Sequence, residues 1–285
     1  MTTTAPAHET NQHPTNQHYD LDPAVFEQFL DPMRKYSAGR YLSESDDLAT
    51  AQRHKLRFVA ERMGITDGER VLDIGCGWGA LTLFMAQRYD CTVTGVTPAP
   101  RQRDHIVATA AQRGLADRVT VHNGGFEEFT AAPGSFDAAA ALGSVIHMPD
   151  LPAVLARARR LLRRGALFYV SESCFRTAAI QEEFDARPGT GFVRNAIFGN
   201  GRLRPLSELV AAAESAGFAV AAVDDLTDDY RRTIEAWIAN VTDATDRLDA
   251  IEDGLAEQLT HYLEIANAGW GYTTKHYGLT LRNAR

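Results

Sequence analysis

The chain has little that would suit it to an oxidising compartment or to a membrane. Only three of its 285 residues are cysteines, Cys76, Cys91 and Cys174, which is too few for a disulfide scaffold and lacks the spacing of a metal site. This scarcity points to a reducing cytosol. No apolar run approaches the roughly 18 residues of a membrane span, and the N-terminus lacks the pattern of a secretion signal. We therefore expect a cytoplasmic protein with no stable membrane insertion and no metal.

Positive charge is also scarce. The 29 lysines and arginines are outnumbered by 37 acidic residues, which gives a net charge of −8. Without a basic arm, such a chain has no reason to take nucleic acid as its main partner. At 45% hydrophobic and 23% charged residues, the composition is that of a globular protein. We expect a small-molecule substrate, and a homo-oligomer is compatible with this composition.

The N-terminal region changes character near residue 19. Residues 1–18 are polar and have almost nothing to bury, so they read as a disordered tail. Apolar residues at helical spacing follow in segments 23–33 and 49–63. These two helices would form an N-terminal helical cap over residues 19–65 of a single domain that spans residues 19–285.

The rest of the chain alternates short apolar runs with helical patterns. The predicted strands are 71–74, 92–96, 119–122, 138–142 and 167–170, and the predicted helices are 80–86, 102–113 and 151–162. This alternation predicts an α/β fold with a parallel sheet and helices on both faces. Residues 219–223 and 272–281 could complete the sheet. A helix-rich stretch at 182–198 interrupts the rhythm and predicts a lid insertion over about 176–205.

The most informative segment couples an apolar run to closely spaced glycines. Residues 71–74 (Val-Leu-Asp-Ile) lead directly into Gly75, Gly77 and Gly79, and a helical pattern follows. Glycine lets the backbone turn tightly and lets a ligand lie against it, and the N–H groups at the helix start attract polar acceptors. The G-x-G-x-G spacing differs from the G-x-G-x-x-G of dinucleotide folds. Asp73 would repel a pyrophosphate and suits a cation, such as a sulfonium that carries an α-amino group.

This segment resembles the first motif of class I S-adenosylmethionine-dependent methyltransferases. The resemblance extends to the cyclopropane-fatty-acid synthase family, which includes the mycolic acid methyltransferases and plant coclaurine N-methyltransferase. It is carried by Tyr36-Ser37, Gln52 with Lys55-Leu56, residues 71–79, Gly95-Val96-Thr97 with Gln102, Gly125-Phe126-Glu127, and Tyr230 with Trp237. The resemblance implies a Rossmann-like, doubly wound, mostly parallel seven-stranded sheet.

The resemblance also implies a binding site for S-adenosylmethionine as cofactor. The residues implied at its methionine end are Tyr36, Ser37, Asp73, Gly75, Gly77 and Gly79. Those implied at the ribose are Thr97 and Gln102, and those around the adenine are Gly125, Phe126 and Glu127. Phe126 would stack on the adenine ring, and Glu127 would accept a hydrogen bond from its exocyclic amine.

One part of the family pattern is broken. Lipid-modifying members hold a bicarbonate base with a Cys, a Glu, a His and a Tyr, and the first three positions here are Ala38, Ile146 and Val170. Only Tyr230 remains. Burying an anion without polar partners costs several kcal/mol. Cyclopropanation of acyl chains by the bicarbonate mechanism is therefore disfavoured.

Two residues remain as candidate bases beside Tyr230. His147 follows the predicted fourth strand, where open α/β sheets bind their ligands, and its imidazole can take a proton near neutral pH. The alkaloid N-methyltransferases of the family keep a histidine there. Glu172 follows the predicted strand 167–170, and apolar surroundings would raise its pKa. Either residue could instead be structural. His147 could order the loop before Pro149, and Glu172 could cap a helix or pair with an arginine.

These observations favour a methyltransferase that acts on a small, largely apolar metabolite. The reaction we expect is N-methylation of an amine in secondary-metabolite biosynthesis, including antibiotic biosynthesis. C-methylation of an isoprenoid or fatty alkene is the alternative within the class. A non-catalytic protein that only binds S-adenosylmethionine is the alternative from another class. The sequence does not choose between His147 and Glu172 as the base.

Overall fold

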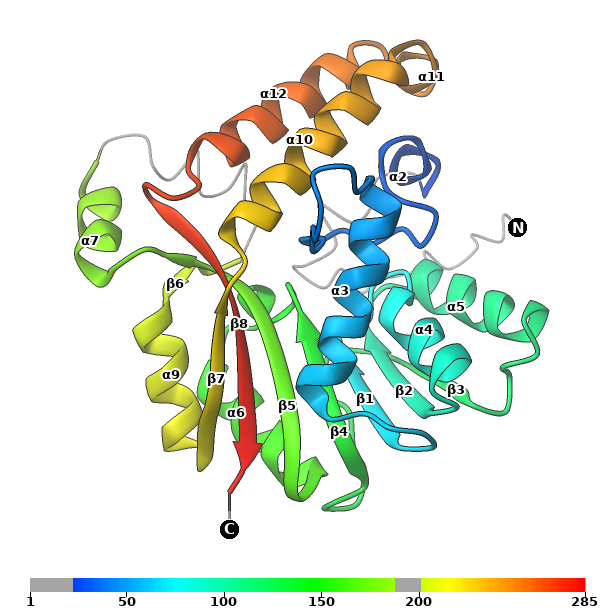
Figure 1. Cartoon of the computed structure of the whole chain (residues 1–285), viewed down its shortest axis with the longest axis vertical. Coiled ribbons are helices and arrows are strands. Elements are labelled where there is room, and N and C mark those ends of the chain that lie inside the picture. The colour runs from blue at the N-terminus through cyan, green and yellow to red at the C-terminus, as the bar shows by residue number, and fades with distance from the viewer. Residues whose placement is uncertain (1–22, 188–200, 285) are drawn as a thin grey trace, which may run out of the picture.

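A mixed β-sheet forms the centre of the molecule (Figure 1). The computed structural model describes residues 23–187 and 201–284. The strands are β1 (Arg70–Ile74), β2 (Thr92–Thr97), β3 (Val119–Asn123), β4 (Phe136–Leu142), β5 (Leu162–Phe175), β6 (Arg204–Pro205), β7 (Phe218–Asp225) and β8 (Thr274–Asn283). Their order is β3-β2-β1-β4-β5-β8-β7, and the two-residue β6 pairs with β5 outside this path.

The strand order places a crevice beside β1. The chain runs from β1 to β2 and β3 on one side, then crosses to β4 and β5 on the other, and all of these pair in parallel. Ligands of open α/β sheets bind at such a switch point, beyond the carboxyl ends of the strands. Among the strands of the described residues, β8 alone runs antiparallel to its neighbours, β5 and β7. The expected seven-stranded, mostly parallel sheet is thus confirmed.

Helices cover both faces of the sheet. The helices that pack on it are α3 (Leu48–Met63), α4 (Ala80–Arg88), α5 (Pro100–Gln112), α6 (Leu151–Leu161) and α9 (Leu206–Ser215). Because side chains alternate along a strand, Ala138 and Ala140 of β4 pack with α3, α4 and α5. Ala139 and Ala141 pack with α6 and α9 on the other face. The sheet is therefore doubly wound, as expected.

A group of helices lies over the edge at which the parallel strands end (Figure 1). We call it the helical roof: α2 (Pro23–Phe29), α10 (Thr227–Asp243), α11 (Thr245–Asp249) and α12 (Leu255–Ala268). It has its own apolar core, which includes Phe26, Phe29, Trp237 and Leu263. Helix α2 was expected from the sequence, but the three C-terminal helices that make up most of the roof were not.

Several element boundaries differ from those expected. Helix α2 ends at Phe29 instead of residue 33, because Asp31 turns back to accept from the backbone N–H of Met33 and of Lys35. Strand β5 continues to Phe175 instead of ending at residue 170, because β8 pairs with it throughout. Of the expected lid, the structure describes α7 (Ala178–Ala186). Residues 1–18 and 188–200 lie outside the described residues.

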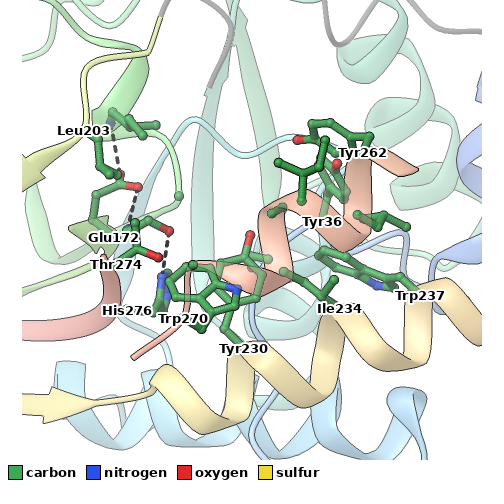
Figure 2. Close-up of a pocket in the computed structure, with 18 of the residues that line it drawn as sticks. Tyr36, Glu172, Leu203, Tyr230, Ile234, Trp237, Tyr262, Trp270, Thr274 and His276 are labelled. Atoms are coloured by element: carbon green, nitrogen blue, oxygen red, sulfur yellow. Dashed lines mark hydrogen bonds between the residues drawn. The ribbon is translucent and has the colours of Figure 1, made fainter. Parts of the chain in front are cut away.

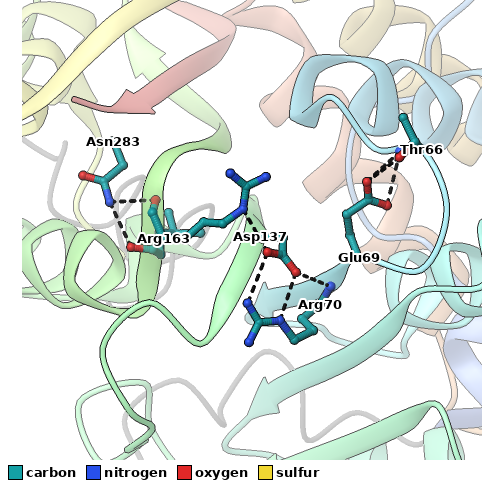
Figure 3. Close-up of polar contacts among 7 residues, drawn as sticks. Thr66, Glu69, Arg70, Asp137, Arg163 and Asn283 are labelled. Carbon is teal, nitrogen blue, oxygen red and sulfur yellow. Dashed lines mark hydrogen bonds and ion pairs between the residues drawn. The ribbon is translucent and has the colours of Figure 1, made fainter. Parts of the chain in front are cut away.

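An ion cluster joins the starts of three strands (Figure 3). Asp137 near the start of β4 accepts from Arg70 of β1 at 3.0 Å and from Arg163 of β5 at 2.9 Å. The hydrogen bonds from Arg70 lower the pKa of Asp137 to about 2. The cluster lies at the opposite edge of the sheet from the crevice, so we assign it to stability.

Candidate active site

The turn after β1 is shaped by its three glycines. Gly75, Gly77 and Gly79 all have positive φ, at +75°, +53° and +84°, where side chains are strained. A Cβ on Gly75 would lie 2.3 Å from that of Ser144, and one on Gly79 would lie 2.5 Å from Ile106. A Cβ on Gly77 would meet nothing within 4 Å. The first and third glycines therefore allow close packing, and Gly77 borders open space.

That open space is a cavity of about 130 Å³, which we call the glycine-loop cavity. Its walls include most of the residues expected to bind the cofactor: Tyr36, Gly75, Gly77, Thr97, Gln102, Gly125, Phe126 and Glu127. The Thr97 hydroxyl donates to Gln102 Oε1 at 2.7 Å, and both side chains are buried. These residues come from the loop between α2 and α3, the glycine turn, the ends of β2 and β3, and the start of α5. The fold thus gathers distant segments around one cavity.

Three of the expected cofactor residues are placed differently. Gly79 does not line the glycine-loop cavity but precedes α4 and packs against Ile106. Asp73 lies beneath the glycine turn, where its carboxylate accepts from the Thr82 hydroxyl at 2.8 Å. Ser37 faces the neighbouring cavity described below and accepts from Lys55 Nζ at 3.2 Å. Asp73 and Gly79 therefore support the glycine turn without lining the cavity.

Lys35 was not among the residues expected at the cofactor site. It lines the glycine-loop cavity although its side chain is buried. Burial lowers its pKa, and the Asp73 carboxylate opposes this shift. The only signal in the sequence was a lysine directly before the Tyr36-Ser37 motif. A buried lysine amino group on this wall suits the carboxylate of an amino-acid ligand.

The residues of the glycine-loop cavity fit S-adenosylmethionine. Gly77 leaves room for a ligand against the backbone, Lys35 offers a hydrogen-bond donor, and the aromatic ring of Phe126 forms part of the wall. The Thr97 and Gln102 pair offers polar groups without a carboxylate. Lys35 suits the amino-acid end of the cofactor, the Thr97 and Gln102 pair suits its ribose, and Phe126 suits its adenine.

A second and larger cavity, of about 430 Å³, lies between the sheet edge and the roof. We call it the roof cavity. The two cavities share Phe26, Tyr36, Gly143 and His147, so they meet at these residues. The roof cavity is mostly apolar and aromatic, with Tyr36, Tyr230, Trp237, Tyr262 and Trp270 in its wall (Figure 2). Its position beyond the glycine loop suits an acceptor molecule.

The three candidate catalytic residues are brought together here. His147, in the short helix η1 (Val145–His147), borders both cavities. Tyr230 of α10 packs between Trp270, at 4.8 Å between ring centroids, and His276, at 4.7 Å. Glu172 projects from β5 into the wall of the roof cavity (Figure 2).

Glu172 has an unusual environment for a carboxylate. It is 4% exposed and accepts from the backbone N–H of Ile146 at 3.0 Å and of Ser173 at 3.1 Å. Burial raises its pKa to about 7, although these hydrogen bonds and the charge of Arg204 act in the opposite direction. Contrary to expectation, it lies inside the strand and not after it. The group can therefore exchange a proton near neutral pH.

His276 of β8 also lines the roof cavity and was not predicted. Its Nε2 lies 2.7 Å from the Ser171 hydroxyl and its Nδ1 lies 3.2 Å from the Ser173 hydroxyl. Burial lowers its pKa to about 3, so the imidazole is neutral at physiological pH. Only the pairing of β5 with β8 brings this histidine to the cavity.

The apolar replacements in the family pattern are distributed around the same region. Ile146 lines the roof cavity, whereas Ala38 and Val170 are buried and are not part of its wall. Within the described ranges, no group of three or more His, Cys, Asp or Glu side chains is arranged to hold a metal ion. Nor does any helix in those ranges have the length and apolarity needed to cross a membrane.

Comparison with known proteins identifies the family. The profile of the mycolic acid cyclopropane synthetase family matches residues 7–275. The S-adenosylmethionine-dependent methyltransferase UmaA of Mycobacterium tuberculosis is 27% identical over 270 residues, which cover 92% of this chain and 93% of UmaA. The cyclopropane-fatty-acyl-phospholipid synthase of Escherichia coli is 45% identical over 87 residues, 30% of this chain and only 22% of that enzyme.

Solved structures share the fold. The mycolic acid cyclopropane synthase CmaA1, complexed with SAH and CTAB, has a TM-score of 0.84 at 25% identity and covers 95% of this chain and 98% of its own. The structure of coclaurine N-methyltransferase bound to N-methylheliamine and SAH has a TM-score of 0.83 at 21% identity. The match covers 95% of this chain and 82% of the coclaurine N-methyltransferase chain, and it supports the fold alone.

The fold and the paired cavities define a class I S-adenosylmethionine-dependent methyltransferase, and the cofactor is S-adenosylmethionine. Within that class, the chain belongs to the mycolic acid cyclopropane synthetase family.

Proposed function

We propose that this methyltransferase N-methylates a small, largely apolar amine of natural-product biosynthesis, with Glu172 as the base. One observation carries the proposal: a buried carboxylate with a pKa near 7 lies on the wall of the roof cavity. Three of the four positions that would hold a bicarbonate base are apolar in this chain. The chain therefore carries its own base where lipid-modifying relatives recruit one.

The cofactor would lie in the glycine-loop cavity. Lys35 would face its carboxylate, Thr97 and Gln102 its ribose, and Phe126 and Glu127 its adenine. When bound there, S-adenosylmethionine supplies an electrophilic methyl group on a sulfonium. The remaining task of the protein is to orient a nucleophile towards that methyl and to exclude water.

The roof cavity supports an apolar amine as acceptor. Tyr230, Trp237 and Trp270 present aromatic faces, which attract a cationic ammonium and pack against an apolar body. Glu172 is the buried anion on the same wall. An ammonium that enters would pair with this carboxylate and so offset the cost of burying either charge alone.

Glu172 would then remove the proton that keeps the amine from reacting. A carboxylate with a pKa near 7 is a stronger base than an exposed one, which reduces the free-energy gap to an alkylammonium. His147, at the junction of the two cavities, would orient the amine lone pair towards the methyl. Tyr230 would close the side of the reacting centre against water.

The test is a methyl-transfer assay with a defined set of acceptors. Labelled S-adenosylmethionine is supplied with 1,2,3,4-tetrahydroisoquinoline, with geranyl diphosphate and with vesicles of unsaturated phosphatidylethanolamine, and products are located by mass spectrometry. We expect transfer to the ring nitrogen, and loss of about a hundredfold in Glu172→Gln. Methylation of the isoprenoid or lipid carbon without any amine product would refute the proposal.

C-methylation of an isoprenoid or fatty alkene is the second candidate. The same aromatic faces of Tyr230, Trp237 and Trp270 would stabilise a carbocation, and Glu172 would remove the proton that completes the reaction. What favours the amine is the buried carboxylate, because an ionised group beside a neutral alkene gains nothing on binding that would offset its own desolvation.

A further inference from the structure

We propose that Arg204 is a positioning residue that fixes the loop carrying His147, at the wall that the glycine-loop cavity and the roof cavity share. This loop, residues 145–149, comprises η1, Met148 and Pro149, and we call it the junction loop. The part given to His147 in methyl transfer rests on the proposed function. The contacts of Arg204 with the junction loop are independent of it.

The junction loop lies between β4 and α6 in the chain and faces both cavities. Ile146 and His147 line the roof cavity, and His147, Met148 and Pro149 line the glycine-loop cavity. Helix η1 is only three residues long. Contacts from other elements must therefore set the position of the loop, and with it the position of the His147 ring.

Arg204 supplies such contacts through its guanidinium. The residue lies in β6, which pairs with β5, and its side chain is only 3% exposed. Its Nη2 donates to the backbone carbonyls of Met148 and Pro149, at 3.3 Å in both cases. Because a guanidinium is planar and rigid, this nitrogen holds two successive peptide groups in one orientation. These are the peptide groups that directly follow His147 and its neighbour.

The guanidinium is itself held from the other side. Its Nε donates to Oε1 of Glu208 in α9 at 3.1 Å, and its Nη1 donates to the carbonyl of Arg202 at 3.1 Å. A buried cation needs such partners to offset its desolvation. The charge of Arg204 also lowers the pKa of Glu172. A substitution that tests the position of the loop alone must therefore keep this charge, as lysine does.

Arg202 offers a matched control two residues away. Its side chain pairs with the same Glu208, at 3.3 Å, but is 61% exposed. Among the described residues, its guanidinium makes no hydrogen bond to the junction loop. Its backbone N–H donates to the carbonyl of Ile146 at 2.8 Å, and a substitution retains that bond. Arg202→Lys thus removes a guanidinium from Glu208 without removing the contact to the loop.

Nuclear magnetic resonance tests the position of His147 without any acceptor. The protein is labelled with ¹³C-histidine and saturated with S-adenosylhomocysteine, and the ring signal of His147 is assigned by its loss in His147→Ala. We expect Arg204→Lys to shift this signal while those of His54 in α3 and His261 in α12 stay in place, which shows that the fold is intact. Arg202→Lys should shift none of them. An unshifted His147 signal in Arg204→Lys would overturn the inference, whatever the substrate is.

A second measurement uses the wild-type protein and so does not depend on whether a variant folds. Two carbonyls on Nη2 of Arg204 should restrict rotation about the bond from Cζ to Nη2. We therefore expect separate signals for the Nη2 protons in ¹⁵N-arginine-labelled protein. Free rotation at Nη2 would refute the inference.

A double-mutant cycle tests whether Arg204 acts through His147. We expect Arg204→Lys to lower kcat for 1,2,3,4-tetrahydroisoquinoline about tenfold, because a small misplacement of an orienting group has an effect of this size. Arg202→Lys should change kcat less than about twofold. In the His147→Ala background, Arg204→Lys should lower kcat no further, a result that a general loss of structure would not produce. Losses that multiply would refute the inference alone. Methylation of the isoprenoid or lipid carbon without any amine product would refute the N-methylation, and the same cycle on that acceptor would then decide the inference.

Discussion

Replacing Glu172 by glutamine distinguishes a carboxylate kept for chemistry from one kept for stability. Burial raises its pKa to about 7 from the usual 4.5. The folded protein therefore holds this proton more tightly than the unfolded chain does. The stabilisation from the protonated group is fully present below pH 4.5 and is lost as pH rises through 7, so above that the ionised group works against folding.

The size of the effect follows from the two pKa values. A shift from 4.5 to about 7 corresponds to about 3 kcal/mol of unfolding free energy, of which about 2 kcal/mol is lost between pH 5 and pH 8. Glutamine does not ionise, but it offers one acceptor oxygen where the carboxylate offered two, at a cost of about 1 kcal/mol. We expect Glu172→Gln to be more stable than the wild type at pH 8 by about 1 to 2 kcal/mol, and no more stable at pH 5.

Urea unfolding at both pH values measures this difference, with Glu182→Gln on the exposed surface of α7 as the matched control. Methyl transfer is measured on the same samples and should fall about a hundredfold in Glu172→Gln. A variant that gains stability while losing activity marks a functional group. If Glu172→Gln were instead less stable than the wild type at pH 8, Glu172 would be a structural anchor for η1 and Arg204, and the assignment of the base would fail.

Four further outcomes are expected. His147→Ala should lower turnover at least tenfold while calorimetry finds the affinity for S-adenosylhomocysteine almost unchanged; a wild-type rate would remove His147 from the mechanism. Added bicarbonate should not accelerate the reaction, and strong stimulation would restore the lipid-type mechanism. Lys35→Met should weaken S-adenosylhomocysteine at least tenfold in calorimetry, and Lys275→Met should not; equal affinities would show that Lys35 does not contact the cofactor. Asp137→Asn should lower the unfolding free energy by about 1 to 2 kcal/mol at pH 7. The reason is that the depressed pKa of Asp137, about 2, gives stability that is present above pH 3.8 and is lost as pH falls through 2. A difference between variant and wild type that persisted at pH 2 in urea titrations would contradict this.

Local patterns were enough to predict much of the fold and one of the two cavities. Strands and helices up to residue 162 follow from apolar periodicity, and the glycine turn is recognisable because Gly75 and Gly79 need space that any Cβ would occupy. The residues that meet at the glycine-loop cavity each stand at the end of a strand or in a short motif. Parallel topology then brings such ends together.

The roof cavity depended on contacts that no local pattern encodes. Helix α10 packs against both α12 and the distant α2, so the role of these helices becomes visible only with the fold. His276 reaches the cavity because β8 pairs with β5 in a register that sets His276 opposite Ser173. The burial of Lys35 is likewise not visible in the local sequence, and the carboxylate that opposes the effect of burial on its pKa, Asp73, belongs to another element.

The missing bicarbonate ligands and the presence of Glu172 are best understood as one change. A base recruited from solvent must be held by polar side chains and must lose its translational freedom, whereas a base attached to the backbone has neither requirement. The resemblance to the lipid-modifying members puts Ile146 at the position of their glutamate, and the backbone N–H of Ile146 donates to Glu172 at 3.0 Å. The side chain at 146 is thereby free to be apolar. If Glu172 is the base, as proposed, the apolar residues Ala38 and Val170 are accounted for, because a tethered carboxylate needs no polar group at those positions.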